Sequence, residues 1–148
     1  MTTEQFVPYE MKTSIIHILS YDDKNLEGYL ENAFFKGRRY FSNLTQMIFL
    51  VEELLDSMVF PPRATSMRSF TAGAAHRVRA GRAAGGEEKP IASFRLSVLF
   101  RQNASWQGNI QWMDDHAATP FRSVLELVQL MDSVLAQYDH AGGHTEKV

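Results

Sequence analysis

Histidine and carboxylate side chains are the groups in this 148-residue sequence that most directly suggest metal chemistry. Asp114, Asp115 and His116 are consecutive, and His140 and His144 are four residues apart. Consecutive residues project in different directions, so the first group is more typical of a polar loop than of a metal site. Two glycines separate the histidine pair and disfavour the helix that would bring both rings to one face. We therefore predict no metal ligands and no cofactor.

Motifs for nucleophilic or phosphate chemistry do not occur in the sequence. There is no cysteine, which excludes a thiolate zinc site, a disulfide framework and a cysteine nucleophile. The phosphate loop GxxxxGK[ST], the dinucleotide motif GxGxxG, the zinc motif HExxH and the serine motif GxSxG are all missing. The sequence identifies no partner for His17 in acid–base work. We therefore predict a protein without enzymatic activity.

An internal repeat is the most informative feature of the chain. Residues 15–58 align with residues 95–138 at a constant offset of 80 positions, with no insertion or deletion. The alignment keeps the apolar periodicity and the turn positions in register, which predicts a duplicated folding unit. The identical pairs are Leu19 and Leu99, Gly28 and Gly108, Phe41 and Phe121, Leu50 and Leu130, and Leu55 and Leu135.

The first part of each copy has the pattern of two strands. Apolar residues at even positions alternate with other residues over 94–100, which is the period of a half-buried strand. Short connections at 22–25 and 102–105 have the composition of hairpin loops. Residues 38–40 and 117–119 give only a weak indication of a further short strand in each copy.

The second part of each copy has the pattern of a helix. Ser123 and Glu126 form a capping box, in which the hydroxyl accepts a hydrogen bond from a free backbone N–H and the carboxylate reaches back to the backbone N–H of Ser123 itself. Asn43 and Gln46 at the aligned positions can do the same. An apolar stripe at helical spacing follows each cap, so both helices can cover one face of a sheet.

One such unit of roughly 44 residues is too small to bury its own core, whereas two units can share one. We therefore predict an α+β fold in which a duplicated ββα unit forms a pseudo-twofold antiparallel sheet with two helices packed on one face. The two repeats together form one domain. The predicted boundaries are a tail at 1–12, a first repeat at 13–58, a linker at 59–92, a second repeat at 93–137 and a tail at 138–148.

The segment between the copies differs from them in charge and composition. It has six basic and two acidic residues, a net of +4, so the rest of the chain carries −6 of the total of −2. Prolines and glycines interrupt regular structure, which favours a flexible basic linker. Binding of an acidic partner or nucleic acid, and docking on the protein's own acidic surface, stay open as alternatives. The candidate contacts are Arg63, Arg68, Arg77, Arg79 and Arg82.

The sheet face opposite the helices is the predicted interaction surface. If even-numbered strand residues face the helices, the odd-numbered residues form an open face of aromatic, aliphatic, arginine and amide groups, which is typical of an interface. The hairpin that follows the second repeat's first strand adds polar groups. The candidate partner or ligand surface comprises Tyr21, Tyr29, Arg95, Arg101, Gln102, Asn103 and Gln107.

We predict a binding or adaptor module that contacts a protein partner or a second copy of itself through this face. Nucleic-acid binding is one alternative, with Tyr21 or Tyr29 stacked on bases and linker arginines on phosphates. Binding of a small ligand, by a protein or enzyme of unknown type, is the other. Because the face is expected to be exposed, Arg101→Glu combined with Tyr21→Ala should weaken association and leave thermal stability nearly unchanged.

Two stretches of the second copy resemble a known group of proteins. The stretches FRQNASWQG at Phe100–Gly108 and FRSVLEL at Phe121–Leu127 resemble small bacterial proteins of uncharacterised function. The resemblance is centred on residues 94–135 and reaches the first copy through the repeat. It implies a bacterial or phage-related source and no particular activity.

The sequence also bears on localisation. Its first residues are polar and lack the basic start and apolar stretch of a signal peptide. Its longest apolar runs are far short of the roughly 20 residues that a membrane span needs. We therefore expect a cytoplasmic protein without membrane contact.

Overall fold

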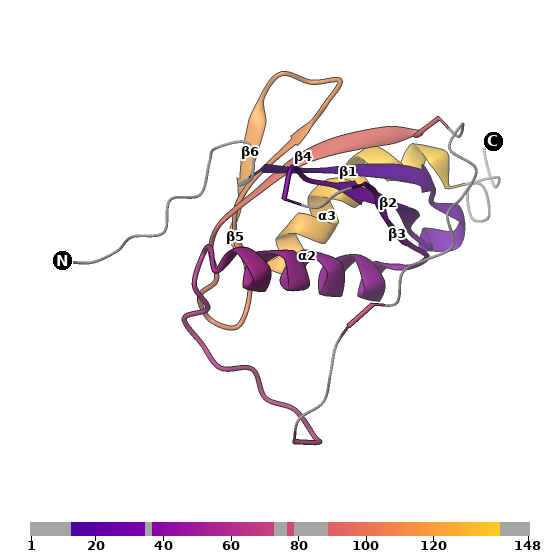
Figure 1. Ribbon diagram of the computed structural model, residues 1–148. Coiled ribbons are helices and arrows are strands. Elements are labelled where there is room, and N and C mark those ends of the chain that lie inside the picture. The colour runs from indigo at the N-terminus through magenta and orange to yellow at the C-terminus, as the bar shows by residue number, and fades with distance from the viewer. Residues whose placement is uncertain (1–12, 35–36, 73–76, 79–88, 140–148) are drawn as a thin grey trace.

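The computed structural model describes residues 13–34, 37–72, 77–78 and 89–139. The fold class is α+β, as the sequence predicts, and the predicted tail at 1–12 and most of that at 138–148 lie outside the described residues. Figure 1 shows the elements in space. In chain order they are β1 (Thr13–Ser20), η1 (Asp22–Lys24), β2 (Glu27–Glu31), β3 (Arg39–Phe41), α2 (Leu44–Met58), β4 (Ala92–Phe100), β5 (Gln107–Trp112), β6 (Ala118–Phe121), α3 (Val124–Leu135) and η2 (Ala136–Tyr138).

The six strands form one antiparallel sheet in the order β3-β2-β1-β4-β5-β6. β1 and β4 are its central pair, with Ile15 opposite Arg95. The sheet thus continues from residues 13–58, the first half, into residues 92–138, the second half. The backbone ladder between β1 and β4 joins the two halves.

Each half has three strands before its helix, whereas the sequence predicts two. The additional strands, β3 and β6, form the two edges of the sheet. They have three and four residues, too few to show a clear alternation of apolar and polar side chains. Pro120 in β6 suits an edge because proline has no backbone N–H to donate to a further strand.

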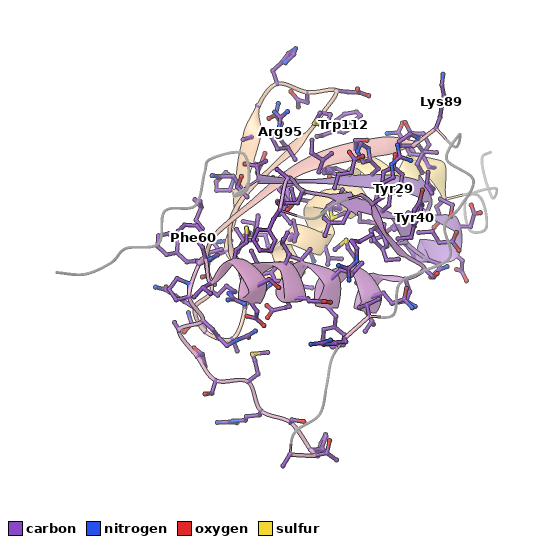
Figure 2. The ribbon with its side chains drawn as sticks, in the orientation of Figure 1. Tyr29, Tyr40, Phe60, Lys89, Arg95 and Trp112 are labelled. Atoms are coloured by element: carbon purple, nitrogen blue, oxygen red, sulfur yellow. The ribbon has the colours of Figure 1, made fainter. Side chains whose placement is uncertain are left out.

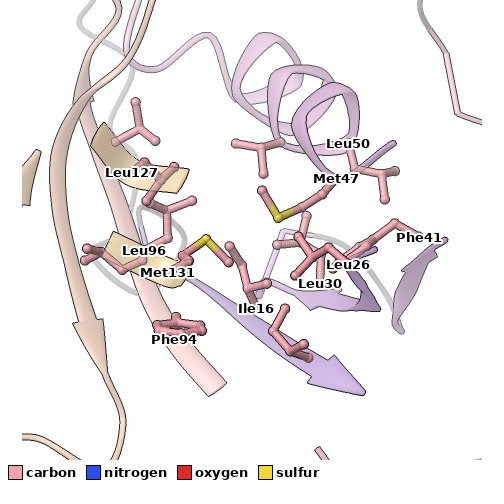
Figure 3. Packing of buried hydrophobic residues seen from close by; sticks show 14 of the residues in the cluster. Ile16, Leu26, Leu30, Phe41, Met47, Leu50, Phe94, Leu96, Leu127 and Met131 are labelled. Carbon is pink, nitrogen blue, oxygen red and sulfur yellow. The ribbon is translucent and has the colours of Figure 1, made fainter. Parts of the chain in front are cut away.

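A single apolar core lies between the sheet and both helices. Even-numbered strand residues such as Ile16 and Phe94 point into this core and meet Met47 of α2 and Leu127 of α3 (Figure 3). Both helices therefore cover the same face of the sheet, which leaves the odd-numbered residues on an outer face. No helix among the described residues is long and apolar enough to cross a membrane.

Both helices begin at the predicted caps. Asn43 Oδ1 accepts a hydrogen bond from Gln46 N at 2.9 Å, and Ser123 Oγ accepts one from Glu126 N at 3.1 Å. The Glu126 carboxylate accepts from the backbone N–H of Arg122, one residue before the N–H of Ser123 that the sequence predicts. This bond and those from the Arg122 side chain lower the pKa of Glu126 to about 2. Local sequence therefore determines where each helix starts.

Local geometry repeats between the halves at the offset of 80 residues. Adding 80 to the bounds of β1, β2, β3 and α2 gives the bounds of β4, β5, β6 and the α3–η2 run to within one residue. The strand register shifts near the end of β1 and at the same place in β4. Each following hairpin has two residues with positive φ, Asp23 and Lys24 in the first and Asn103 and Ala104 in the second.

Two glycines allow the return strands to lie close to their neighbours. A Cβ added at Gly28 would lie 2.0 Å from the carbonyl oxygen of His17, and one at Gly108 would lie 1.9 Å from that of Ser97. Both oxygens belong to the backbone of a paired strand, so they cannot rotate away as a side chain could. The occurrence of glycine at both positions, 80 residues apart, therefore has a steric cause.

We expect Gly108→Ala to lower the free energy of unfolding by about 1–3 kcal/mol, because β4 and β5 must separate to admit the methyl group. Urea unfolding of the variant and the parent protein measures the difference. Asn109→Ala in the same strand is the matched control, since its side chain lies on the outer face and removing it creates no clash. Equal stabilities of the two variants would contradict the steric account.

Candidate binding sites between the two halves

Tyr21 and Arg101 lie on the helix side of the sheet, so their predicted placement on the outer face is wrong. Their exposures are only 7% and 4%. The register shifts near the ends of β1 and β4 add one residue to each strand and reverse the alternation of side chains beyond it. Both residues therefore point toward the helices, where each meets a carboxylate.

Tyr29 lies on the outer face, but only 4% of it is exposed. The His17 ring stacks on it with 4.7 Å between centroids, and the Tyr40 ring lies at 5.1 Å (Figure 2). The Arg38 guanidinium lies over the same ring at 4.4 Å. Because Tyr21 and Tyr29 are both covered, neither ring is available to stack on a nucleic-acid base.

The other predicted surface residues fall in two places. Arg95 is exposed on the outer face and donates to Gln111 Oε1 at 3.4 Å. Gln107 spans the hairpin at 102–105, since its Oε1 accepts from Gln102 N at 2.9 Å and its Nε2 donates to Gln102 O at 3.0 Å. Asn103 is exposed in that hairpin. The structure thus groups three of the four at the hairpin and leaves Arg95 apart from them.

His17 has partners that the sequence does not identify. Its Nδ1 lies 2.7 Å from Ser93 Oγ, and its Nε2 lies 2.9 Å from Glu31 Oε1. Contact between a serine, a histidine and a carboxylate is the arrangement that activates a serine nucleophile. The equivalent cross-strand position in the other half holds Thr13 and Ser97, whose hydroxyls lie 3.2 Å apart. A polar link between β1 and β4 is therefore common to both positions, which indicates a structural role.

The basic linker begins by folding back on the first helix. Arg63 forms ion pairs with Glu52 and Asp56 of α2. Arg63 therefore docks on the protein's own acidic surface, one of the alternatives that the sequence leaves open. Two of the other linker arginines, Arg68 and Arg77, line a cavity beside this contact. The remaining two, Arg79 and Arg82, lie outside the described residues.

Arg101 anchors a buried charge network where the second half meets α2. Its Nε donates to Pro61 O at 2.9 Å, and its Nη1 donates to Asp56 Oδ1 at 2.8 Å and to Glu52 Oε1 at 3.3 Å. Glu52 also accepts from Arg63, so the carboxylate lies between two guanidinium groups. Burying an arginine is unfavourable unless its charge is paired, and the two carboxylates of α2 provide this pairing.

The first part of the linker crosses this network as an irregular segment, which we call the connector (residues 59–72). Ala64 N donates to Arg101 O at 3.1 Å, and residues 63 and 101 form a parallel bridge. Below it, Trp106 donates its indole N–H to Glu52. A cavity of about 610 Å³ lies among the connector, α2 and the hairpin at 102–105. We call this site the closed junction.

The positions 80 residues away form a second junction between the halves. Tyr21, at the position equivalent to Arg101, donates its hydroxyl to Oδ1 of Asp132, which is equivalent to Glu52. Lys24 also donates to that oxygen, and both distances are 2.7 Å. Burial, followed by the bond to Asp132, raises the pKa of Tyr21 above its ordinary value. The bonds from Lys24 and Tyr21 lower the pKa of Asp132.

A mainly apolar cavity of about 350 Å³ lies at this second junction. None of the described connector residues lines it, so we call this site the open junction. Six of its nine lining residues have equivalents that line the closed junction. The equivalent pairs are Lys24 and Ala104, Leu26 and Trp106, Leu44 and Val124, Val128 and Ile48, Gln129 and Phe49, and Asp132 and Glu52.

Sequence reasoning missed both junctions and the carboxylates at their centres. The signal that could have indicated them is the alignment itself, which places Glu52 and Asp132 at the same position of the two helices. Each lies beside the apolar stripe of its helix, where a carboxylate needs a partner if it is half-buried. The partners come from the opposite half, so the spacing within one copy does not reveal them.

Comparison of the chain with protein-family models, curated proteins and solved structures found no match. Among the described residues, no group of three or more histidine, aspartate or glutamate side chains is placed to hold a metal ion.

The burial of Arg101 changes the expected effect of replacing it. We expect Arg101→Ala to lower the free energy of unfolding by about 3 kcal/mol, because it leaves the carboxylates of α2 short of a buried partner and opens space beneath Pro61. The small effect expected for an exposed residue applies instead to Arg95→Ala, the matched control on the same strand. Urea unfolding measures both variants, and similar losses would contradict the assigned network.

Asp132 should make the stability of the fold depend on pH. Its folded-state pKa lies below the ordinary value of 3.8, so its contribution is present above that pH and is lost as pH falls through the folded-state pKa. The stability difference between the parent protein and Asp132→Asn should therefore shrink as pH falls from about 5 to about 2. Urea unfolding at several pH values measures this difference. A difference that is constant with pH would contradict the assignment.

Proposed function

We propose that the protein is a binding module without enzymatic activity, and that it binds a segment of a partner protein at the open junction. The observation that carries this proposal is the contrast between two similar sites. The closed junction holds a segment of the chain itself, while none of the described connector residues reaches the open junction. Because the closed junction binds a segment of chain, the similar open junction is suited to bind a segment of another protein.

The similarity of the two sites follows if the chain is a duplicated βββα unit with pseudo-twofold symmetry. The repeated element bounds, register shifts and hairpin conformations support this interpretation. In addition, Ile15 pairs with Arg95, the residue that the offset makes its equivalent. A strand pairing centred on two equivalent residues is self-complementary, as in the interface of a twofold dimer.

Contacts between the halves are also reciprocal. Tyr21 of the first half donates to Asp132 of the second, and Arg101 of the second half donates to Glu52 of the first. In a twofold arrangement, contacts of this kind occur twice, once in each direction. The duplication therefore supplies two copies of one site, and only one of them is covered by the described part of the connector.

The chemistry of the open junction supports a partner over a reaction. Its walls are apolar, with Leu26, Leu44 and Val128 among them, and Asp132 and Lys24 provide a few polar contacts at its rim. A largely apolar cavity with a few well-placed polar groups is typical of a binding site. Its volume of about 350 Å³ also falls in the range of small-ligand pockets, which supports a small ligand as the second candidate.

Photo-crosslinking from the rim of the open junction tests the proposal. Gln129 is exposed and lines the cavity, so p-benzoylphenylalanine at this position of the full chain should crosslink a bound partner on irradiation of cells that naturally produce the protein. Val128→Trp adds an indole to the cavity wall and should reduce the yield of protein adducts about tenfold, equivalent to a loss of about 1.4 kcal/mol in binding. Mass spectrometry identifies and quantifies the adducts.

Leu125→Trp is the matched control, because it adds the same indole at a residue of α3 that is 69% exposed and does not line the cavity. It should leave the adduct yield unchanged. Absence of adducts from the parent protein, or equal yields from both tryptophan variants, would contradict the proposal. A small molecule that native mass spectrometry finds on the parent protein but not on Val128→Trp would assign the site to a small ligand instead.

A further inference from the structure

We infer that the open junction binds a basic segment of its partner, which pairs in parallel with the backbone at Tyr21 and places an arginine or lysine on Asp132. This inference rests on the proposed function and specifies the chemistry of the partner. The template for it is the connector as it lies on the closed junction.

Three features hold the connector on the closed junction. Arg63 forms an ion pair with Glu52, and the next residue, Ala64, donates its backbone N–H to the carbonyl of Arg101. Met67, four residues after Arg63, lines the cavity. The pattern is therefore a cation, a backbone hydrogen bond from the next residue and an apolar side chain four residues after the cation.

The open junction offers an equivalent for the first two features. Asp132 takes the place of Glu52, and its hydrogen bonds from Tyr21 and Lys24 both end on Oδ1. A carboxylate accepts hydrogen bonds on both oxygens, so Oδ2 is placed to receive a second cation. Arg101 forms a bridge with the connector, whereas Tyr21 forms no such bridge with a described residue. The backbone at Tyr21 is therefore the equivalent place for a parallel segment.

The third feature has its equivalent in the cavity wall. Leu26 and Val128 stand where the closed junction has Trp106 and Ile48, and Met131 adds further apolar surface. An apolar side chain of the partner that follows its basic residue would enter this cavity and lose its contact with water. Burial of an apolar side chain is favourable, so the cavity contributes to the affinity for such a segment.

The charge of the rim favours a basic partner. Asp23 N donates to Asp139 Oδ1 at 2.7 Å, which brings the acidic hairpin of Asp22 and Asp23 to the end of α3 that also carries Asp132. The C-terminal end of a helix attracts cations as well. The carboxylates of Asp23 and Asp132 disfavour a phosphate-bearing ligand at this rim and favour a basic peptide.

Lys24 is the basic side chain already at this rim, and its position permits exchange. It is 56% exposed in its ion pair with Asp132, and exposed ion pairs contribute little free energy. The closed junction has Ala104 at the equivalent position and takes its cation from the connector instead. An arginine from the partner can therefore join or replace Lys24 on Asp132 at a small cost.

A synthetic peptide with the connector sequence of residues 60–70, FPPRATSMRSF, tests the inference on the full chain. Two-dimensional NMR reports each site separately: the signals of Tyr21, Val128 and Met131 report the open junction, and the indole N–H of Trp106 reports the closed one. We expect the peptide to shift the open-junction signals in a salt-dependent manner. Asp132→Asn, or a peptide with glutamate in place of its first arginine, should weaken binding about tenfold.

Leu125→Trp serves again as the unaffected control. Shifts confined to the Trp106 indole would show that the peptide only exchanges with the connector. Equal binding of the glutamate peptide would show that the site does not recognise the positive charge. Either result overturns the inference. Absence of peptide binding together with cavity-dependent adducts from Gln129 would overturn the inference and leave the proposed function standing. Absence of both would overturn the two together.

Discussion

The pairing of β1 with β4 is the interaction on which the rest of the structure depends. Neither half is long enough to bury a core of its own, and the β1–β4 ladder places their apolar faces side by side as one surface. Ile16 of β1 and Phe94 of β4 then share a core with residues of both helices. The same pairing creates the two junctions, because it brings the end of each half's first strand to the helix of the other half.

The position of the register shift decides what each junction contains. An extra residue near the end of β1 and of β4 turns Tyr21 and Arg101 from the outer face to the helix side. There Tyr21 contacts Asp132 and Arg101 contacts Glu52, and these two carboxylates are at equivalent positions. A tyrosine satisfies its carboxylate with one hydroxyl and leaves the neighbouring cavity accessible. An arginine brings a full charge and several donors, and its network extends to the connector carbonyl of Pro61. The two equivalent positions thus carry different side chains, and the Arg101 side chain is the one that contacts the described connector.

The two junctions also differ in what the described residues place on them. The closed junction serves stability, since its buried guanidinium is paired only while the connector and α2 hold their places. The open junction keeps the shape of the same site without the connector and adds an acidic rim. Under the proposed function, the chain uses one of the two similar sites to secure itself and keeps the other for a partner.

The sequence by itself determined the elements that rest on local interactions: the alternation of the long strands, the two caps at Asn43 and Ser123, and the offset that relates the halves. The sequence also predicted correctly which strand residues face the helices, as far as the register shifts near the ends of β1 and β4. The short edge strands, the burial of Tyr29 and the direction of Tyr21 and Arg101 were decided by tertiary structure alone. The physical reason is that a bulge changes the facing of every residue beyond it, and the partners that make a buried charge tolerable, Glu52 for Arg101 above all, come from the opposite half of the chain.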